Sequence, residues 1–170
     1  MIKLSLYMAT VLLNTNFAAT TTPLSPGVNA APAAVVMAEQ QIVDLTNTER
    51  RRSGLGELTI NPMLIQVARQ HSREMYERDY FDHASPVAEL KTPMKRYLSA
   101  LGYVPRWACV GENLFYCSIV DPVHGHHCLM QSPKHRENIM DRRFDQIGVG
   151  AYVAADGRFW LTQVFLAQRG

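Results

Sequence analysis

The chain has 170 residues, a length that suits a single domain. Its 17 basic and 15 acidic residues leave a formal net charge of +2, far below the charge that a nucleic-acid-binding protein concentrates on one face. We therefore expect no nucleic-acid partner.

The N-terminal residues have the pattern of an export signal. Lys3 precedes a mostly apolar run that ends at Leu13, which is typical of a secretory leader and too short to cross a bilayer. Small residues permit cleavage after Ala30, and the region around Ala18 and Ala19 is the alternative. We predict a secreted or periplasmic protein without a stable membrane span in its mature form. Its expected parts are a signal peptide at 1–30, a linker at 31–37 and one domain at 38–170.

Helix signals dominate the first three quarters of the expected domain. Apolar residues at helical spacing follow residue 38, and Gly54 ends that segment. Asn61-Pro62 and Thr92-Pro93 each combine a capping side chain with a proline, which is a signal for the start of a helix. The expected helices cover about 38–52, 62 to beyond 75, 93–101, 119–131 and 133–140.

The last thirty or so residues change to a strand pattern. Two runs rich in β-branched and aromatic residues, at 147–153 and 158–165, flank Asp156-Gly157. Because Asp-Gly between two such runs is a strong hairpin signal, we predict a C-terminal antiparallel hairpin. Helices that precede a hairpin predict an α+β fold with a shared core.

Three short segments carry the side chains with the most chemistry. Phe81-Asp82-His83 follows the second expected helix, Gly111-Glu112-Asn113 lies in a segment that its glycine loosens, and Ser132-Pro133-Lys134-His135 begins the last helix. Side chains at such boundaries can project into a cleft. Each also has a structural explanation: His83 could pack under its loop, Glu112 could cap a helix, and we expect Ser132 to cap the helix of His135.

Nine short motifs, in order along the chain, resemble the CAP superfamily of cysteine-rich secretory, antigen 5 and pathogenesis-related proteins, in particular its bacterial SCP-like branch. They are Asn47-x-x-Arg50, Gly54-Leu55, Leu58-x-x-Asn61, Ala68-x-x-His71, Phe81-x-His83, Gly111-Glu112-Asn113, Ser132-Pro-x-His135-Arg136, Ile147-Gly-Val-Gly150 and Gln163-Val-Phe165. The resemblance implies a bacterial protein with an α-β-α sandwich and a broad cleft. It also identifies Asn47, Arg50 and Asn113 as parts of the structural motif.

The same resemblance implies which residues line the cleft. Members of the family place two histidines and two acidic residues facing one another, and His83, Glu112 and His135 match three of these four. The fourth acidic position falls at Ser132, which removes one carboxylate. A mechanism that requires both carboxylates is therefore not expected here.

Two imidazoles and one carboxylate suit a divalent transition metal, because all three are ordinary zinc ligands. We therefore expect His83, His135 and Glu112 to be able to hold zinc. The resemblance favours a non-enzymatic extracellular module, a monomer or weak oligomer, that binds a small ligand such as a lipid or sterol. The alternative is a metal-dependent hydrolase in which Glu112 acts as base, although no His-Glu-x-x-His motif accompanies it.

The three cysteines allow more than one disulfide arrangement. In an oxidising compartment, Cys109, Cys117 and Cys128 would give one disulfide and one thiol. All three pairings are open, as are three reduced cysteines, and we favour Cys109 with Cys117.

A second metal site would require the segment His124-Gly-His126-His127-Cys128 to be a loop, because neighbouring side chains on a helix point in different directions. We therefore expect a partly exposed polar helix face there. His71 is expected to be a core histidine bonded to the backbone.

Overall fold

The computed structural model describes residues 32–169, which form two helical layers around one sheet. The elements are α1 (Ala33–Arg52), β1 (Thr59–Ile60), α2 (Pro62–Glu77), the short 3-10 helix η1 (Ala88–Leu90), α3 (Pro93–Leu101), β2 (Trp107–Cys117), α4 (Pro122–Gln131), α5 (Pro133–Met140), β3 (Gln146–Val153) and β4 (Phe159–Arg169). The predicted signal peptide lies outside the described residues.

Capping side chains and prolines start the helices as the sequence predicts. The Asn61 side chain accepts hydrogen bonds from the backbone of Met63 and Leu64, and Thr92 accepts one from Lys95. Each cap satisfies N–H groups that the first helical turn leaves unpaired. Ser132 is an exception, because its side chain makes no capping hydrogen bond at the start of α5. The prediction that Ser132 caps this helix was therefore wrong.

Helix α1 begins earlier than the sequence analysis expected. It starts at Ala33, so residues 33–37, which were assigned to a linker, are helical. Val35 and Ala38 are buried against the core one helical turn apart, and they continue the apolar face that includes Ile42. The alanine- and proline-rich composition suggested a linker, but alanine favours a helix and Pro32 stands just before its first residue.

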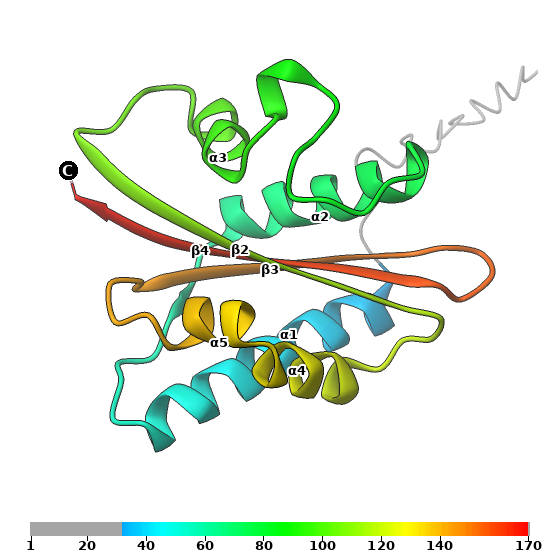
Figure 1. The fold of residues 1–170 in the computed structure, drawn as a ribbon, viewed down its shortest axis with the longest axis horizontal. Helices are drawn as coiled ribbons and strands as arrows, with labels where there is room; N and C mark the ends of the chain where they lie inside the picture. The colour runs from blue at the N-terminus through cyan, green and yellow to red at the C-terminus, as the bar shows by residue number, and fades with distance from the viewer. Residues whose placement is uncertain (1–31, 170) are drawn as a thin grey trace, which may run out of the picture. The chain divides into compact units, whose positions relative to one another are not determined.

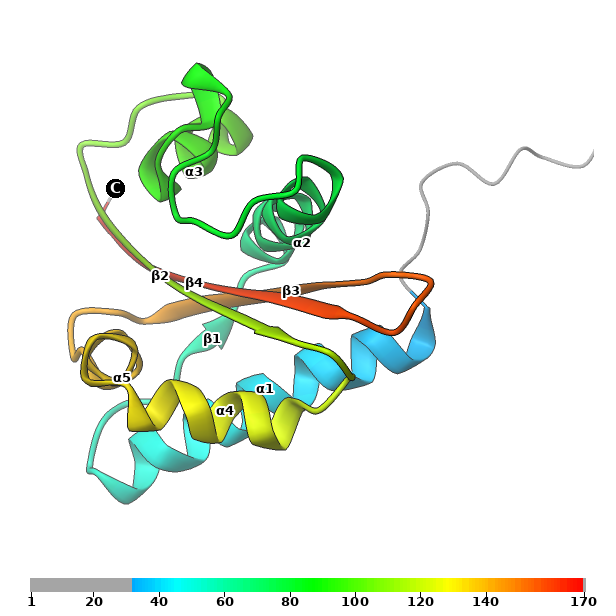
Figure 2. The same ribbon diagram turned by 45° about the vertical axis from the view of Figure 1, so that its right-hand side comes forward.

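The helices cover the two faces of the sheet. In Figures 1 and 2, α2 and α3 lie on one face, while α1, α4 and α5 lie on the other. The strand order is β1-β3-β4-β2, with β1 parallel to β3 and the remaining pairs antiparallel. This arrangement confirms the predicted α-β-α sandwich and the C-terminal hairpin of β3 and β4.

Strand β2 is the main element that the sequence analysis missed. The segment around Gly111, expected to be irregular, lies inside an 11-residue strand at one edge of the sheet. A Cβ atom at Gly111 would come within 2.8 Å of the Phe144 ring, so this glycine permits close packing and does not loosen the chain. The alternation of a strand sends Glu112 and Leu114 toward α2, and Asn113 and Phe115 toward α1.

The position of Cys109 and Cys117 in β2 excludes the disulfide that we favoured. The two residues lie near opposite ends of one strand, so eight residues at about 3.3 Å each place them roughly 26 Å apart. A disulfide requires Cα atoms within about 7 Å. All three cysteines are unpaired and half-buried in this structure.

Close backbone contact sets α2 against β3. Cβ atoms added at Gly148 and Gly150 would overlap the backbone of α2 at Leu64 and Arg69. No side chain fits in that space, so the Ile-Gly-Val-Gly motif lets the helix rest directly on the strand. This contact fixes α2, and with it the loop that follows it, over the sheet.

Arg50 joins the end of α1 to the segment between α5 and β3. It is 1% exposed, and its guanidinium donates to the carbonyls of Gly56 at 2.7 Å, Ile139 at 2.9 Å, Asp141 at 2.9 Å and Phe144 at 3.1 Å. Only the planar fork of arginine presents donors in so many directions. Arg50 thus connects α1 to the end of α5 and to the loop that follows it.

Replacing Arg50 by lysine tests this role. Arg50→Lys leaves buried carbonyls without donors, so we expect the free energy of unfolding to fall by about 3 kcal/mol. Arg51→Lys, at a neighbouring exposed position, should change it by less than about 0.5 kcal/mol. Urea denaturation measures both, and equal stability of the two variants would contradict the assigned role.

Candidate functional site

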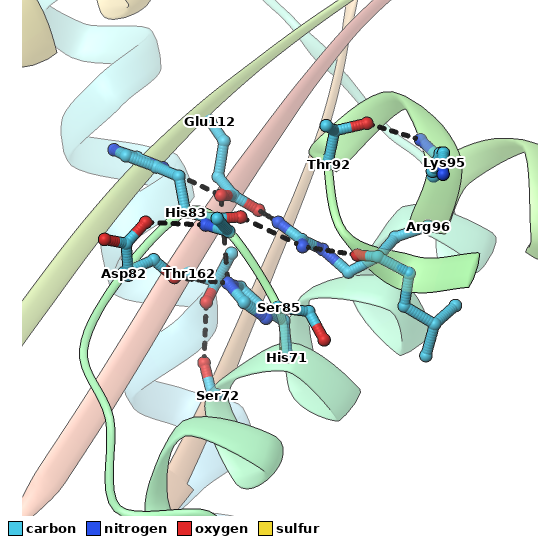
Figure 3. A network of polar contacts seen from close by, with 12 residues as sticks. His71, Ser72, Asp82, His83, Ser85, Thr92, Lys95, Arg96, Glu112 and Thr162 are labelled. Atoms are coloured by element: carbon cyan, nitrogen blue, oxygen red, sulfur yellow. Dashed lines mark hydrogen bonds and ion pairs between the residues drawn. The ribbon is translucent and has the colours of Figure 1, made fainter. Parts of the chain in front are cut away.

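Glu112 forms the centre of a polar site at the edge of the sheet. Its side chain is 1% exposed, which would be costly for an unpaired carboxylate. Arg96 of α3 donates from Nη2 to Glu112 Oε2 at 2.6 Å, and His83 donates from Nδ1 to Oε1 at 2.8 Å. Figure 3 shows Glu112 between these two partners. Both carboxylate oxygens are therefore occupied.

His83 stands at the outer side of this pair. Its side chain is half exposed, and it lies in the loop that follows α2. The hydrogen bond to Glu112 raises the pKa of His83 above its ordinary value, and desolvation opposes this only in part. With Nδ1 held by the carboxylate, Nε2 is the ring nitrogen left for a ligand.

His135 reaches the same region from the opposite layer. Asn113 donates from Nδ2 to the carbonyl of His135 at 3.0 Å, and Asn138 donates to the carbonyl of Glu112 at 3.0 Å. These bonds tie α5 to the edge of β2. Burial lowers the pKa of His135, and a positive charge on His83 lowers it further. Within the described residues, the hydrogen bonds fix the backbone of His135, and none joins its ring to His83 or Glu112.

His71 lies beneath the site, as the sequence analysis predicted for a core histidine. It is fully buried, and its Nε2 donates to the backbone carbonyl of Asp82 at 3.2 Å. Desolvation lowers its pKa, so the ring is neutral near pH 7. Because it holds the carbonyl next to His83, His71 helps to position the loop.

The remaining candidates do not join this arrangement. Ser132 is half-buried, and within residues 32–169 its side chain forms no hydrogen bond with His83, Glu112 or His135. His124 and Cys128 lie together on the outer side of α4, with Nε2 and Sγ 3.5 Å apart. In the same described range, no three His, Cys, Asp or Glu side chains converge to hold a metal ion.

His126 also differs from the expected polar helix face. It is 6% exposed, and neither of its ring nitrogens has a hydrogen-bond partner within the described part of the chain. Desolvation lowers its pKa. The histidine-rich segment is therefore helical, with one histidine turned into the core.

Comparison with known proteins identifies the family. The pattern of the CAP, or cysteine-rich secretory protein, family matches residues 43–165. The chain belongs to the CAP family. The uncharacterized protein YkwD of Bacillus subtilis (strain 168) is 34% identical over 139 residues, which are 82% of this chain and 51% of that protein. The uncharacterized membrane protein YlbC of the same bacterium is 32% identical over 131 residues, 75% of this chain and 34% of that protein.

This CAP chain therefore spans about half of one relative and about one third of the other. Among solved structures, an extracellular SCP-domain protein from Bacillus anthracis str. Ames is 31% identical, with a TM-score of 0.68 over 83% of this chain and 45% of that one. An outer surface protein from Borrelia burgdorferi shares the fold at 19% identity, with a TM-score of 0.68 over 78% of this chain and 94% of its own. No helix within residues 32–169 is both long and apolar enough for a bilayer span.

Arg96 is the residue of this CAP domain's site that the sequence analysis missed. It is 4% exposed and pairs with Glu112, and its Nη1 also donates to the carbonyls of His83 and Leu90. A carboxylate buried in a strand requires a cation, which is a usable signal. The chain has 17 lysines and arginines, however, and the motif alone does not select among them.

The pairing of His83 and Glu112 in the CAP domain predicts a coupled titration. In Glu112→Gln the carboxylate that favours protonated His83 is gone, so we expect the pKa of His83 to fall. As His83 then carries less positive charge, the pKa of His135 should rise slightly. The Cε1–H resonances of both rings, followed by NMR against pH, measure these changes.

Asp82→Asn is the matched control for this titration. Asp82 also favours protonated His83 but only through longer-range attraction, so its loss should lower the pKa of His83 less than Glu112→Gln does. Amide spectra establish that both variants are folded. If the pKa of His83 were the same in Glu112→Gln and in the parent, the assigned pairing would be wrong.

Proposed function

We propose that this chain is an exported binding module, whose ligand is held at the edge of β2 by His83 together with His135. The engagement of both Glu112 oxygens supports this proposal most directly, because the carboxylate then orients His83 and does not react. Export is supported by the leader-like run from Lys3 to Leu13. The description of one similar structure as extracellular and of another as an outer surface protein also favours it.

A divalent metal ion, with zinc as the first candidate, is the proposed inorganic ligand. His83 offers Nε2 while its Nδ1 donates to a carboxylate, which is the usual environment of a metal-bound histidine. His135 offers a neutral ring, since its pKa is lowered. The two histidines fit zinc as donors, whereas Glu112 fits the role of orienting His83 better than that of a third ligand. Bound zinc would supply a Lewis acid with positions left for an external ligand.

Hydrolysis at this site is the less favoured alternative. A general base needs an oxygen or nitrogen within reach of the attacking water. Glu112 accepts from Arg96 at one oxygen and from His83 at the other, and its side chain is 1% exposed, so little of the carboxylate is open to an attacking water. Ser132 adds no second carboxylate.

Calorimetric titration of zinc tests the metal proposal. We expect the parent to bind one zinc ion near pH 7, with affinity lowered at least about tenfold in His83→Ala and in His135→Ala because each removes a donor. Glu112→Gln should weaken binding less, by loss of orientation alone. His127→Ala, which removes an exposed histidine from α4, should leave the affinity unchanged.

Two outcomes would contradict the metal proposal. If the parent does not bind zinc, the metal proposal is wrong. If the parent and His83→Ala bind zinc with equal affinity, the ion binds at a site that does not include His83. A peptide or ester hydrolysis rate that chelation abolishes would instead favour the hydrolase.

An apolar molecule, such as a lipid or sterol, is the proposed organic ligand. Phe81 and Tyr116 are 51% and 43% exposed, and their ring centroids lie 6.2 Å apart. Phe81 stands two residues before His83, and Tyr116 is on the same face of β2 as Glu112. Exposed aromatic rings beside polar groups are typical of sites that bind an apolar body with a polar end.

Fluorescence of dehydroergosterol and of cis-parinaric acid tests this part of the proposal. We expect at least one probe to bind the purified chain, and Phe81→Ala to weaken that binding by about tenfold through loss of aromatic contact. Val36→Ala removes an exposed apolar side chain from α1, on the other face of the sheet, and should have no effect. If neither probe binds, the proposal of an apolar ligand at this site has no support.

A further inference from the structure

A cavity of about 280 Å³ lies between α2 and α3, beside the His83 site. One face of α2 lines it with residues at helical spacing, Val67, Gln70, His71 and Glu74. The facing side of α3 contributes Arg96, Ser99 and Ala100. The residues that line it do not include His83 or His135, so it is a separate space.

The cavity exists because α3 presents small side chains where it faces α2. Neighbouring helices usually fill such a space with interlocking large side chains. Ser99 and Ala100 are too short to do this, and both are exposed. A volume of about 280 Å³ is far more than one water molecule needs and lies near the lower end for small-molecule sites.

Arg96, which lines the cavity, has a buried donor without a hydrogen-bond partner among residues 32–169. Its Nη1 and Nη2 donate to His83, Leu90 and Glu112, but its Nε is buried without a partner in the described residues. Buried donors almost always have an acceptor. Protein atoms cover Nε in this structure, so an oxygen atom in the cavity can accept from it only after the Arg96 side chain shifts.

The charges around the cavity favour a neutral ligand. Glu74 accepts hydrogen bonds from Ser85 at 2.8 Å and from Tyr80 at 2.9 Å, and Arg96 is paired with Glu112. An anion would be attracted by Arg96 but repelled by Glu74. A cation would be attracted by Glu74 but repelled by Arg96. Val67 and Leu90 add apolar surface, which suits a ligand with an apolar body.

We propose that the cavity between α2 and α3 is a second binding site, for a small neutral molecule with an apolar body and one oxygen that accepts from Arg96 Nε. The site differs in position from the one proposed for the metal and the ligand at His83 and His135. Its occupant shares Arg96 with them, but none of its contacts requires either histidine.

Cyclohexanone is the probe that tests this proposal, because it joins an apolar ring to one carbonyl. Cyclohexanecarboxylate and cyclohexylammonium keep the ring but carry a charge. We expect cyclohexanone to shift the Nε–Hε resonance of Arg96 and the amides of α2 and α3, with saturation in the millimolar range. Both charged probes should bind at least about fivefold more weakly.

Filling the cavity provides the matched variant. Ala100→Leu places a larger side chain in the space and should weaken cyclohexanone binding at least about tenfold. Gln66→Leu adds leucine at an exposed position of α2 that does not line the cavity, and should bind as the parent does. If Ala100→Leu disturbs amides far from the cavity, Ser99→Leu replaces it.

The proposal is overturned if no probe gives a saturable shift, or if the filled variant binds cyclohexanone as well as the parent does. A charged probe that binds more tightly than cyclohexanone would overturn the assignment of a neutral ligand. Retained cyclohexanone binding in His83→Ala separates this site from the one at the edge of β2.

Discussion

The compensation of the buried Glu112 carboxylate is the interaction on which the site depends. A charge with so little exposure is stable only when nearby groups replace the water it has lost. Arg96 and His83 do so from two different segments, α3 and the loop after α2. Neutralising one charge therefore also fixes where both segments lie over the edge strand, and it fixes which nitrogen of His83 faces outward.

A second set of polar contacts fixes the opposite side of the site. Asn113 and Asn138 join α5 to the backbone of β2 through amide hydrogen bonds, and Arg50 holds the end of α5 from below. Amide contacts of this kind depend on position and carry no charge. The backbone of His135 is thus held by neutral amide contacts, whereas the His83 ring is held by a charged partner.

Local signals predicted the helices well, because a cap and a proline such as Asn61-Pro62 act within a single turn. They could not predict β2, whose glycine and polar residues are explained only by distant partners such as Phe144 and Gln163. His83 and Glu112 were identified from the order of family motifs and not from periodicity. Arg96 escaped both approaches, since its role depends on which helix the fold places opposite the carboxylate.

Arg96 also connects the two candidate sites physically. Its Nη2 holds Glu112, and Arg96 is also among the residues that line the cavity between α2 and α3. A molecule that pulled on Nε would alter the geometry of the same guanidinium that compensates Glu112, and through Glu112 the orientation of His83. Because linkage between two binding equilibria is reciprocal, a ligand on His83 that favours one position of Arg96 would change affinity in the cavity by the same factor. The two proposed sites thus share one buried arginine, and any coupling between them would act through it.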